Sequence, residues 1–171
     1  MRGSSCLEVH LSRLQDNYSS LRGLAPNNEV IFMVKANAYG HGLIDIVSYA
    51  FKELKITKFG LAALGEAVQI RKVLPGFEIE LFVFSDTEIQ NESANQAYLE
   101  LNIKPIISHL SDLEFLLTNK DFSHLPLFIK FDTGMNRLGI NYTECERFIQ
   151  LLKKYQRNSV EHLLTHYASS Y

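Results

Sequence analysis

The residues best suited to covalent chemistry lie between positions 34 and 42, where the sequence is VKANAYGHG. Five apolar residues, Val30 to Val34, predict a buried strand that ends at Lys35. Gly40 and Gly42 predict a tight turn whose backbone can approach a ligand closely. An amine in an apolar site is poorly solvated in its charged form, which favours the neutral amine that attacks aldehydes. The run therefore predicts a Schiff base with pyridoxal phosphate, and the alternative is a solvated lysine at a strand end.

A second group of charged residues lies in the run KFDTGMNRLG, from Lys130 to Gly139. Apolar neighbours place Lys130 in a buried strand, and the turn that begins at Asp132 brings Arg137 back toward the end of that strand. Two cations close together in a poorly solvated site repel each other, and burial destabilises each of them. In one interpretation, Asp132 neutralises one of the two.

A third candidate, His166, follows a predicted strand in the run LTHYAS, residues 164–169. A histidine at this position is either a core side chain with satisfied hydrogen bonds or a group that faces a site at the strand end. For His41, within the first run, the sequence predicts a hydrogen bond at the surface or in the turn, and no chemical role.

These three runs resemble the motifs of the alanine racemases, pyridoxal-phosphate enzymes built on a barrel with an added β-domain, and the resemblance covers nearly the whole chain. It implies that Lys35 carries pyridoxal 5'-phosphate and acts as one catalytic base, and that Tyr39 hydrogen-bonds the cofactor phosphate. It implies that His166 lies beside the pyridine ring. It also offers a second interpretation of the cation pair, in which Lys130 carries a carbamate that binds Arg137 and holds it against the phenolic oxygen of the cofactor.

The implied function is that of an isomerase that interconverts L-alanine and D-alanine for cell-wall (peptidoglycan) precursors. The full-length protein would be a homodimer whose second base, a tyrosine, comes from the C-terminal domain of the other subunit. Two alternatives remain: a related barrel racemase or decarboxylase acting on another amino acid, and a non-catalytic pyridoxal-phosphate carrier, although such carriers lack a run like Lys130–Gly139. The sequence departs from the family at residues 83–86, VFSD, where a small or glycine-rich turn is expected.

Composition argues against several other functions. The chain has 171 residues, 46% of them hydrophobic, and a net charge of -2, which gives no reason to expect nucleic acid or a charged membrane as a partner. Cys6 and Cys145 fit no metal-ligand spacing and predict plain thiols, and no signal peptide is predicted. These features favour a cytoplasmic protein without a metal site. The longest apolar stretches are strand-sized, so no helix that spans a bilayer is predicted.

Patterns of strands and helices alternate along the chain. A period of two predicts a first strand at Leu7–Leu11. Capping boxes predict the starts of three helices, at Ser12 with Gln15, Ser111 with Glu114, and Thr143 with Glu146. Asn91, Ser93 and Asn95 weaken the helix expected before the strand at Pro105. Six further strands are predicted at Val30–Lys35, Phe59–Ala63, Ile79–Phe84, Pro105–Ser108, Leu127–Phe131 and Val160–His166.

This repeat of strand and helix predicts an α/β fold, either a doubly wound sheet or a (β/α)8 TIM-type barrel. Lys35, Lys130, Asp132 and His166 all lie at the C-terminal ends of predicted strands, and a barrel gathers such residues on one face. The doubly wound alternative would need a G-x-G-x-x-G turn after the first strand, and Gly40-His-Gly42 lacks the third glycine. The barrel is therefore the predicted fold.

A closed barrel has eight strands and about six are predicted here, so residues 12–171 are expected to form an incomplete barrel of a longer polypeptide. Residues 1–11 are assigned separately. Leu7–Leu11 resembles the family strand that pairs with the C-terminal β-domain, and Met1 to Ser4 are typical of an expression leader. The 171-residue chain alone is expected to be inactive as a racemase, because the later barrel loops and the tyrosine of the other subunit are needed.

Overall fold

Strands and helices alternate in a computed structural model that describes residues 6–157 and 159–169. The strands are β1 (Phe32–Met33), β2 (Lys58–Ala63), β3 (Glu80–Asp86), β4 (Ile103–Ile107), β5 (Phe128–Asp132), β6 (Ile140–Asn141) and β7 (His162–Leu164). The helices are α1 (Leu11–Leu24), α2 (Lys35–Tyr39), α3 (Leu43–Lys52), α4 (Leu64–Val73), α5 (Glu92–Glu100), α6 (Leu110–Thr118), the 3-10 helix η1 (Tyr142–Glu144) and α7 (Cys145–Lys154). None of the described helices has the length and apolar character needed to cross a bilayer.

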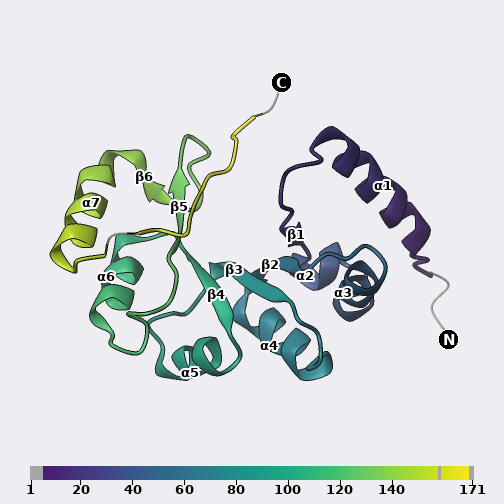
Figure 1. The fold of residues 1–171 in the computed structure, drawn as a ribbon, viewed down its shortest axis with the longest axis horizontal. Helices are drawn as coiled ribbons and strands as arrows, with labels where there is room; N and C mark the ends of the chain where they lie inside the picture. The colour runs from purple at the N-terminus through teal and green to yellow at the C-terminus, as the bar shows by residue number, and fades with distance from the viewer. Residues whose placement is uncertain (1–5, 158, 170–171) are drawn as a thin grey trace.

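The seven strands form one parallel sheet whose order follows the chain from β1 to β6, with β7 also paired to β5. The strands β1 to β6 lie in a curved row with α3, α4, α5 and α6 on its convex side (Figure 1). A doubly wound sheet reverses its strand order at a switch point, and the strands within the described ranges show no such reversal, so the topology favours the barrel. Among the described strands, β1 has a neighbour on one side only, and the row does not close.

Side chains alternate along the strands between two apolar layers. Leu81 and Val83 of β3 are fully buried in the layer between sheet and helices, whereas Phe82 packs on the inner face with Ile106 and Phe128. Four residues of α3 at helical spacing belong to the outer layer: Leu43, Ile46, Val47 and Ala50. The central strands β3, β4 and β5 are therefore packed on both faces, which supports the residues at their ends.

Residues 7–10 pair with no described strand, and α1 begins at Leu11. Because a strand forms only where a neighbour accepts and donates its ladder bonds, and the expected neighbour is a C-terminal β-domain, the strand at Leu7–Leu11 stays a prediction. The N-cap of α1 is His10, so the capping box of Ser12 and Gln15 is wrong. The predicted leader, Met1 to Ser4, lies outside the described residues.

The other helix starts were predicted at the right places but on the wrong residues. α6 begins at Leu110, so Ser111 lies inside the helix instead of capping it. Asn141 caps η1 by accepting a 3.0 Å hydrogen bond from the N–H of Thr143. Asn91 caps α5 in the same way, with a 3.1 Å bond from Ser93. The sequence predicted that Asn91 weakens this helix, whereas the structure shows that Asn91 caps its N-terminus.

All six strands predicted from Val30 onward are present, although most of their ends differ by one or more residues. β1 contracts to Phe32–Met33 because Val34 already bends away toward the turn that contains Lys35. β6 was not predicted, since two residues give no recognisable pattern.

Candidate active site

One cavity of about 170 Å³ lies at the C-terminal ends of the strands, and all five predicted site residues line it: Lys35, Tyr39, Lys130, Arg137 and His166. They come from the turn after β1, from β5 with the loop that follows it, and from the segment after β7. The fold thus brings together segments that are widely separated in sequence, at the face where barrels place their active sites.

Lys35 is followed by a left-handed turn. Residues 36–39 have φ values from 53° to 55°, so α2 is a turn of the opposite hand to an α-helix. This conformation costs an L-residue about 1–2 kcal/mol, and four such residues in succession are strain of the kind that concentrates at functional sites. Gly40, with a φ of 85°, ends the turn without that cost. The turn brings the ring of Tyr39 to 5.9 Å from Nζ of Lys35.

Hydrogen bonds close this turn locally. The N–H of Leu43 donates to Oδ1 of Asn37 at 2.8 Å, which ties the turn to the start of α3. Nδ1 of His41 lies 2.8 Å from the carbonyl oxygen of Ala38, so the turn hydrogen bond predicted for His41 is confirmed. These bonds therefore fix the backbone conformation of the turn that follows Lys35.

Lys130 lies in the interior of β5 and is 8% exposed. Its Nζ donates a hydrogen bond to the carbonyl oxygen of Leu138, on the loop that returns from Arg137. Burial lowers the pKa of Lys130 below its usual value; the negative charge of Asp132 opposes this shift, and the positive charge of Arg137 adds to it. The neutral form of this lysine is therefore more accessible than that of a solvated one.

Asp132 organises the loop after β5. Its Oδ1 accepts backbone hydrogen bonds from Gly134 at 2.9 Å and Asn136 at 3.1 Å, and these bonds hold its pKa below the usual value. Among the described residues, no ion pair joins Asp132 to Lys130 or to Arg137. Direct neutralisation by Asp132 is therefore disfavoured, although its charge still acts on Lys130 through space.

Gly139 allows the loop after β5 to pack directly against the backbone of β5. Its φ is 134°, and a Cβ atom built on it would lie 2.4 Å from the amide nitrogen of Asp132 and 2.5 Å from the carbonyl carbon of Phe131. No side chain fits between these backbone atoms. The next residue, Ile140, pairs with Phe131, so Gly139 fixes where β6 joins β5.

His166 is exposed among the described residues and faces the cavity, so this part of the protein does not favour the interpretation as a core histidine. It follows Thr165, whose hydroxyl lies 2.5 Å from the hydroxyl of Thr133 on the loop after β5. This contact joins the two loops that carry Arg137 and His166. Tyr39 is also largely exposed, at 57%, so the cavity is open on the side that these residues form.

Six further residues line the cavity: Met33, Phe84, Ser85, Leu138, Leu164 and Thr165. Phe84 and Ser85, where the sequence departs from the family, are therefore wall residues of the cavity. A Cβ atom on Gly60 would lie 2.3 Å from Sδ of Met33 and 3.0 Å from Phe84, so these two side chains fill the space that this glycine leaves. Met33 carried no signal in the sequence beyond its place at a strand end.

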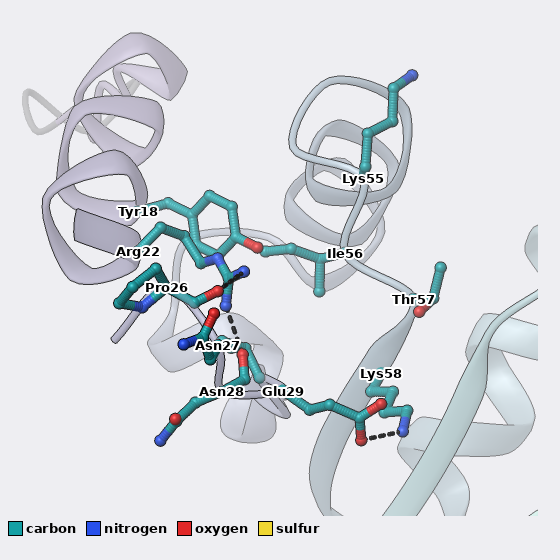
Figure 2. Close-up of a pocket in the computed structure, with 11 residues that line it drawn as sticks. Tyr18, Arg22, Pro26, Asn27, Asn28, Glu29, Lys55, Ile56, Thr57 and Lys58 are labelled. Atoms are coloured by element: carbon teal, nitrogen blue, oxygen red, sulfur yellow. Dashed lines mark hydrogen bonds and ion pairs between the residues drawn. The ribbon is translucent and has the colours of Figure 1, made fainter. Parts of the chain in front are cut away.

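A hollow of about 300 Å³ lies instead at the N-terminal ends of β1 and β2 and contains none of the predicted residues (Figure 2). Arg22 fills part of it and donates to the carbonyl oxygens of Pro26, at 2.7 Å, and Asn28. Lys58 pairs with Glu29 at 2.6 Å. These groups satisfy one another and secure the connection between α1 and β1, so the hollow is a structural feature of the opposite end of the sheet.

Residues 9–171 match the model of a protein family described as alanine racemase, N-terminal domain. The chain belongs to the alanine racemase family. The alanine racemase of Rickettsia akari is 29% identical over 166 residues, which cover 96% of this chain and 45% of that protein. The alanine racemase of Shewanella denitrificans is 31% identical over 173 residues, covering 95% of this chain and 44% of that protein. The chain thus spans a little under half the length of these relatives.

Solved alanine racemase structures share the fold. The enzyme from Corynebacterium glutamicum superposes with a TM-score of 0.77 at 25% identity, over 94% of this chain and 45% of the other. The enzyme from Acinetobacter baumannii gives 0.70 at 30% identity, over 84% of this chain and 39% of the other. The predicted fold class, an incomplete α/β barrel of the alanine racemase type, is confirmed.

Proposed function

We propose that this chain supplies the cofactor-binding side of an active site that interconverts L-alanine and D-alanine. The observation that carries this proposal is the gathering of Lys35, Tyr39, Lys130, Arg137 and His166 around one cavity at the C-terminal ends of the strands. Membership of the alanine racemase family supports it. The full-length protein, meaning this chain with any further residues of the same polypeptide, is the proposed racemase.

The cavity residues suit pyridoxal 5'-phosphate. Cationic side chains and the hydroxyl of Tyr39 can hold a phosphate anion and a phenolic oxygen, and the amine of Lys35 can bind an aldehyde. The volume, about 170 Å³, is below the roughly 300–1,000 Å³ of a complete ligand pocket, so we expect other parts of the full-length protein to complete the walls.

Racemisation removes the α-proton of an amino acid from one face and returns a proton to the other, so it requires two bases on opposite faces. The cofactor supplies an electron sink that stabilises the charge left on the α-carbon. Lys35 would accept and return the proton at its Nζ on one face. The second base is proposed to be a tyrosine from the other subunit, which makes the full-length protein a homodimer with shared active sites. We place this enzyme in the cytoplasm, in the supply of D-alanine for peptidoglycan.

Arg137 needs an anion to hold it, and a carbamate on Lys130 is the proposed anion. Carbon dioxide adds only to a neutral amine, and the lowered pKa of Lys130 enlarges the neutral fraction at a given pH. The addition forms a bond from Nζ to the carbon of carbon dioxide and releases one amine proton to solvent. At a fixed concentration of dissolved carbon dioxide, occupancy by carbamate should therefore rise with pH. The carbamate oxygens would accept hydrogen bonds from the guanidinium of Arg137, which replaces repulsion by attraction.

Replacement of Lys130 by alanine should lower the racemase activity of the full-length protein by about tenfold or more, since Arg137 loses its charged partner. Added acetate or chloride should restore part of the activity by supplying an anion. A carbon-13 signal from labelled carbon dioxide should appear with the parent protein and disappear with Lys130→Ala. Lys120→Ala, which changes an exposed lysine outside the cavity, should retain both activity and signal. Full activity in Lys130→Ala would mean that Asp132 alone balances the positive charge of Arg137 and that no carbamate is needed.

Substrate identity is the test of the proposal as a whole. The full-length protein is incubated with L-alanine, L-serine or L-lysine together with pyridoxal phosphate, and the products are separated by chiral chromatography. We expect D-alanine to form fastest. Predominant racemisation of serine or lysine would point to a related racemase, and loss of carbon dioxide from the substrate would point to a decarboxylase. Binding of the cofactor without any turnover would indicate a carrier.

A further inference from the structure

Lys35 is held between two backbone tethers that lead to the same neighbouring segment. On one side, the N–H of Val34 donates to the carbonyl oxygen of Gly60 in β2 at 2.8 Å. On the other side, the N–H of Asn37 donates to Oε1 of Glu66, in the first turn of α4, at 3.3 Å. The direction in which Lys35 leaves the backbone therefore depends on β2 and on the residues that follow it.

Glu66 collects backbone donors from two segments. Its Oε2 accepts hydrogen bonds from Ala62 at 3.0 Å and from Ala63 at 3.4 Å, at the end of β2, while Oε1 accepts from Asn37. Hydrogen bonds to an ionised carboxylate are stronger than those between neutral groups. One half-buried side chain thus connects the end of β2 to the lysine-bearing turn.

The left-handed turn needs such an external contact. Strained residues keep their conformation only when their surroundings fix it from several directions. Among the described residues, the hydrogen bonds of residues 36–39 stay within residues 34–43, with one exception, the bond from Asn37 to Glu66. Together with the burial of Ala38 in the core, this bond orients the turn relative to the rest of the barrel.

We infer that Glu66 is a positioning residue for Lys35. It holds the left-handed turn at residues 36–39 against the end of β2, so that the amine of Lys35 stays in the cavity. The part of this role that concerns catalysis rests on the proposed racemase function, whereas the clamp itself does not. A purely structural role in starting α4 would leave the turn unaffected by changes that preserve the charge at the helix start.

The variant Glu66→Asp separates these two roles. It keeps a carboxylate at the N-terminus of α4, where negative charge is favourable, but the side chain is one methylene shorter and withdraws from Asn37. Amide hydrogen exchange of the full-length protein, measured by NMR without added cofactor, should be roughly ten- to a hundredfold faster at Asn37, as expected for loss of a bond to a charged acceptor. Exchange at Ala67 and Ile70 within α4 should change little. The matched control Glu146→Asp, in the first turn of α7, should leave Asn37 unchanged.

In the full-length protein, Glu66→Asp should lower kcat about tenfold, with KM for alanine changed by less than about twofold, because misplacement of the reacting group affects the chemical step more than substrate binding. Unchanged exchange at Asn37 would overturn the clamp, whether or not the protein is a racemase. Faster exchange at Asn37 with an unchanged kcat would overturn the positioning of Lys35. If the parent protein racemises nothing, the proposed function fails, and the exchange measurement still decides the clamp.

Discussion

Replacement of Lys35 by alanine should abolish racemisation by the full-length protein. The variant loses the amine that anchors the cofactor and, with it, one of the two bases, so we expect the rate to fall by at least about 10⁴-fold. Chiral chromatography measures the rate. In the parent protein, borohydride reduction in the presence of pyridoxal phosphate should attach the cofactor to Lys35, as peptide mapping will reveal.

The control for this prediction is Lys72→Ala, which removes an exposed lysine of α4 outside the cavity. It should retain full activity and the label on Lys35. Label on a different lysine of the parent protein, or activity in Lys35→Ala above about one tenth of the parent value, would contradict the assignment of Lys35 as anchor and base.

Replacement of Gly139 by alanine should destabilise the chain strongly. The added Cβ would lie 2.4 Å from the backbone of Asp132, and the backbone conformation at φ 134° disfavours any L side chain. Strain and overpacking together should lower the free energy of unfolding by about 3–5 kcal/mol. Urea denaturation followed by circular dichroism measures this change.

Gly76→Ala is the matched control, because a Cβ atom at this loop position would have no neighbour within 4 Å. Its free energy of unfolding should stay within about 0.5 kcal/mol of the parent value. A loss below about 1 kcal/mol in Gly139→Ala would show that the loop between Asp132 and Ile140 has another path available.

The positions of the site residues relative to the strands could be predicted because the reactive side chains lie within or next to apolar runs that are typical of strands. Lys35 and Lys130 each belong to an apolar run, and such runs predict buried strands whatever the tertiary fold. The parallel sheet then required that their ends share one face. That all five residues line a single cavity agrees with this reasoning, while the role of each one stays a prediction.

Other features could not be predicted because they depend on neighbours that are distant in sequence or on fine geometry. The segment at residues 7–10 alternates like a strand, yet strand formation depends on a partner that the described chain does not offer. The left-handed conformation of residues 36–39 has no sequence signature, since Ala and Tyr favour other conformations. The link from Glu66 to Asn37 joins residues that only the folded barrel brings together.

The left-handed turn also limits which residues this segment can accept during evolution or engineering. A β-branched residue such as valine or threonine clashes most severely at positive φ, and proline is fixed at negative φ, so neither type fits at residues 36–39. Glycine fits the folded backbone at each of these positions, but it raises the conformational entropy of the unfolded chain and so lowers stability. Few residue types are therefore compatible with this backbone conformation, chiefly alanine, asparagine, aspartate, and aromatic or polar residues that are not branched at Cβ. Variant libraries that randomise this segment should exclude β-branched residues and proline. Chains that carry them would not form the left-handed turn, so their effect on substrate choice could not be tested.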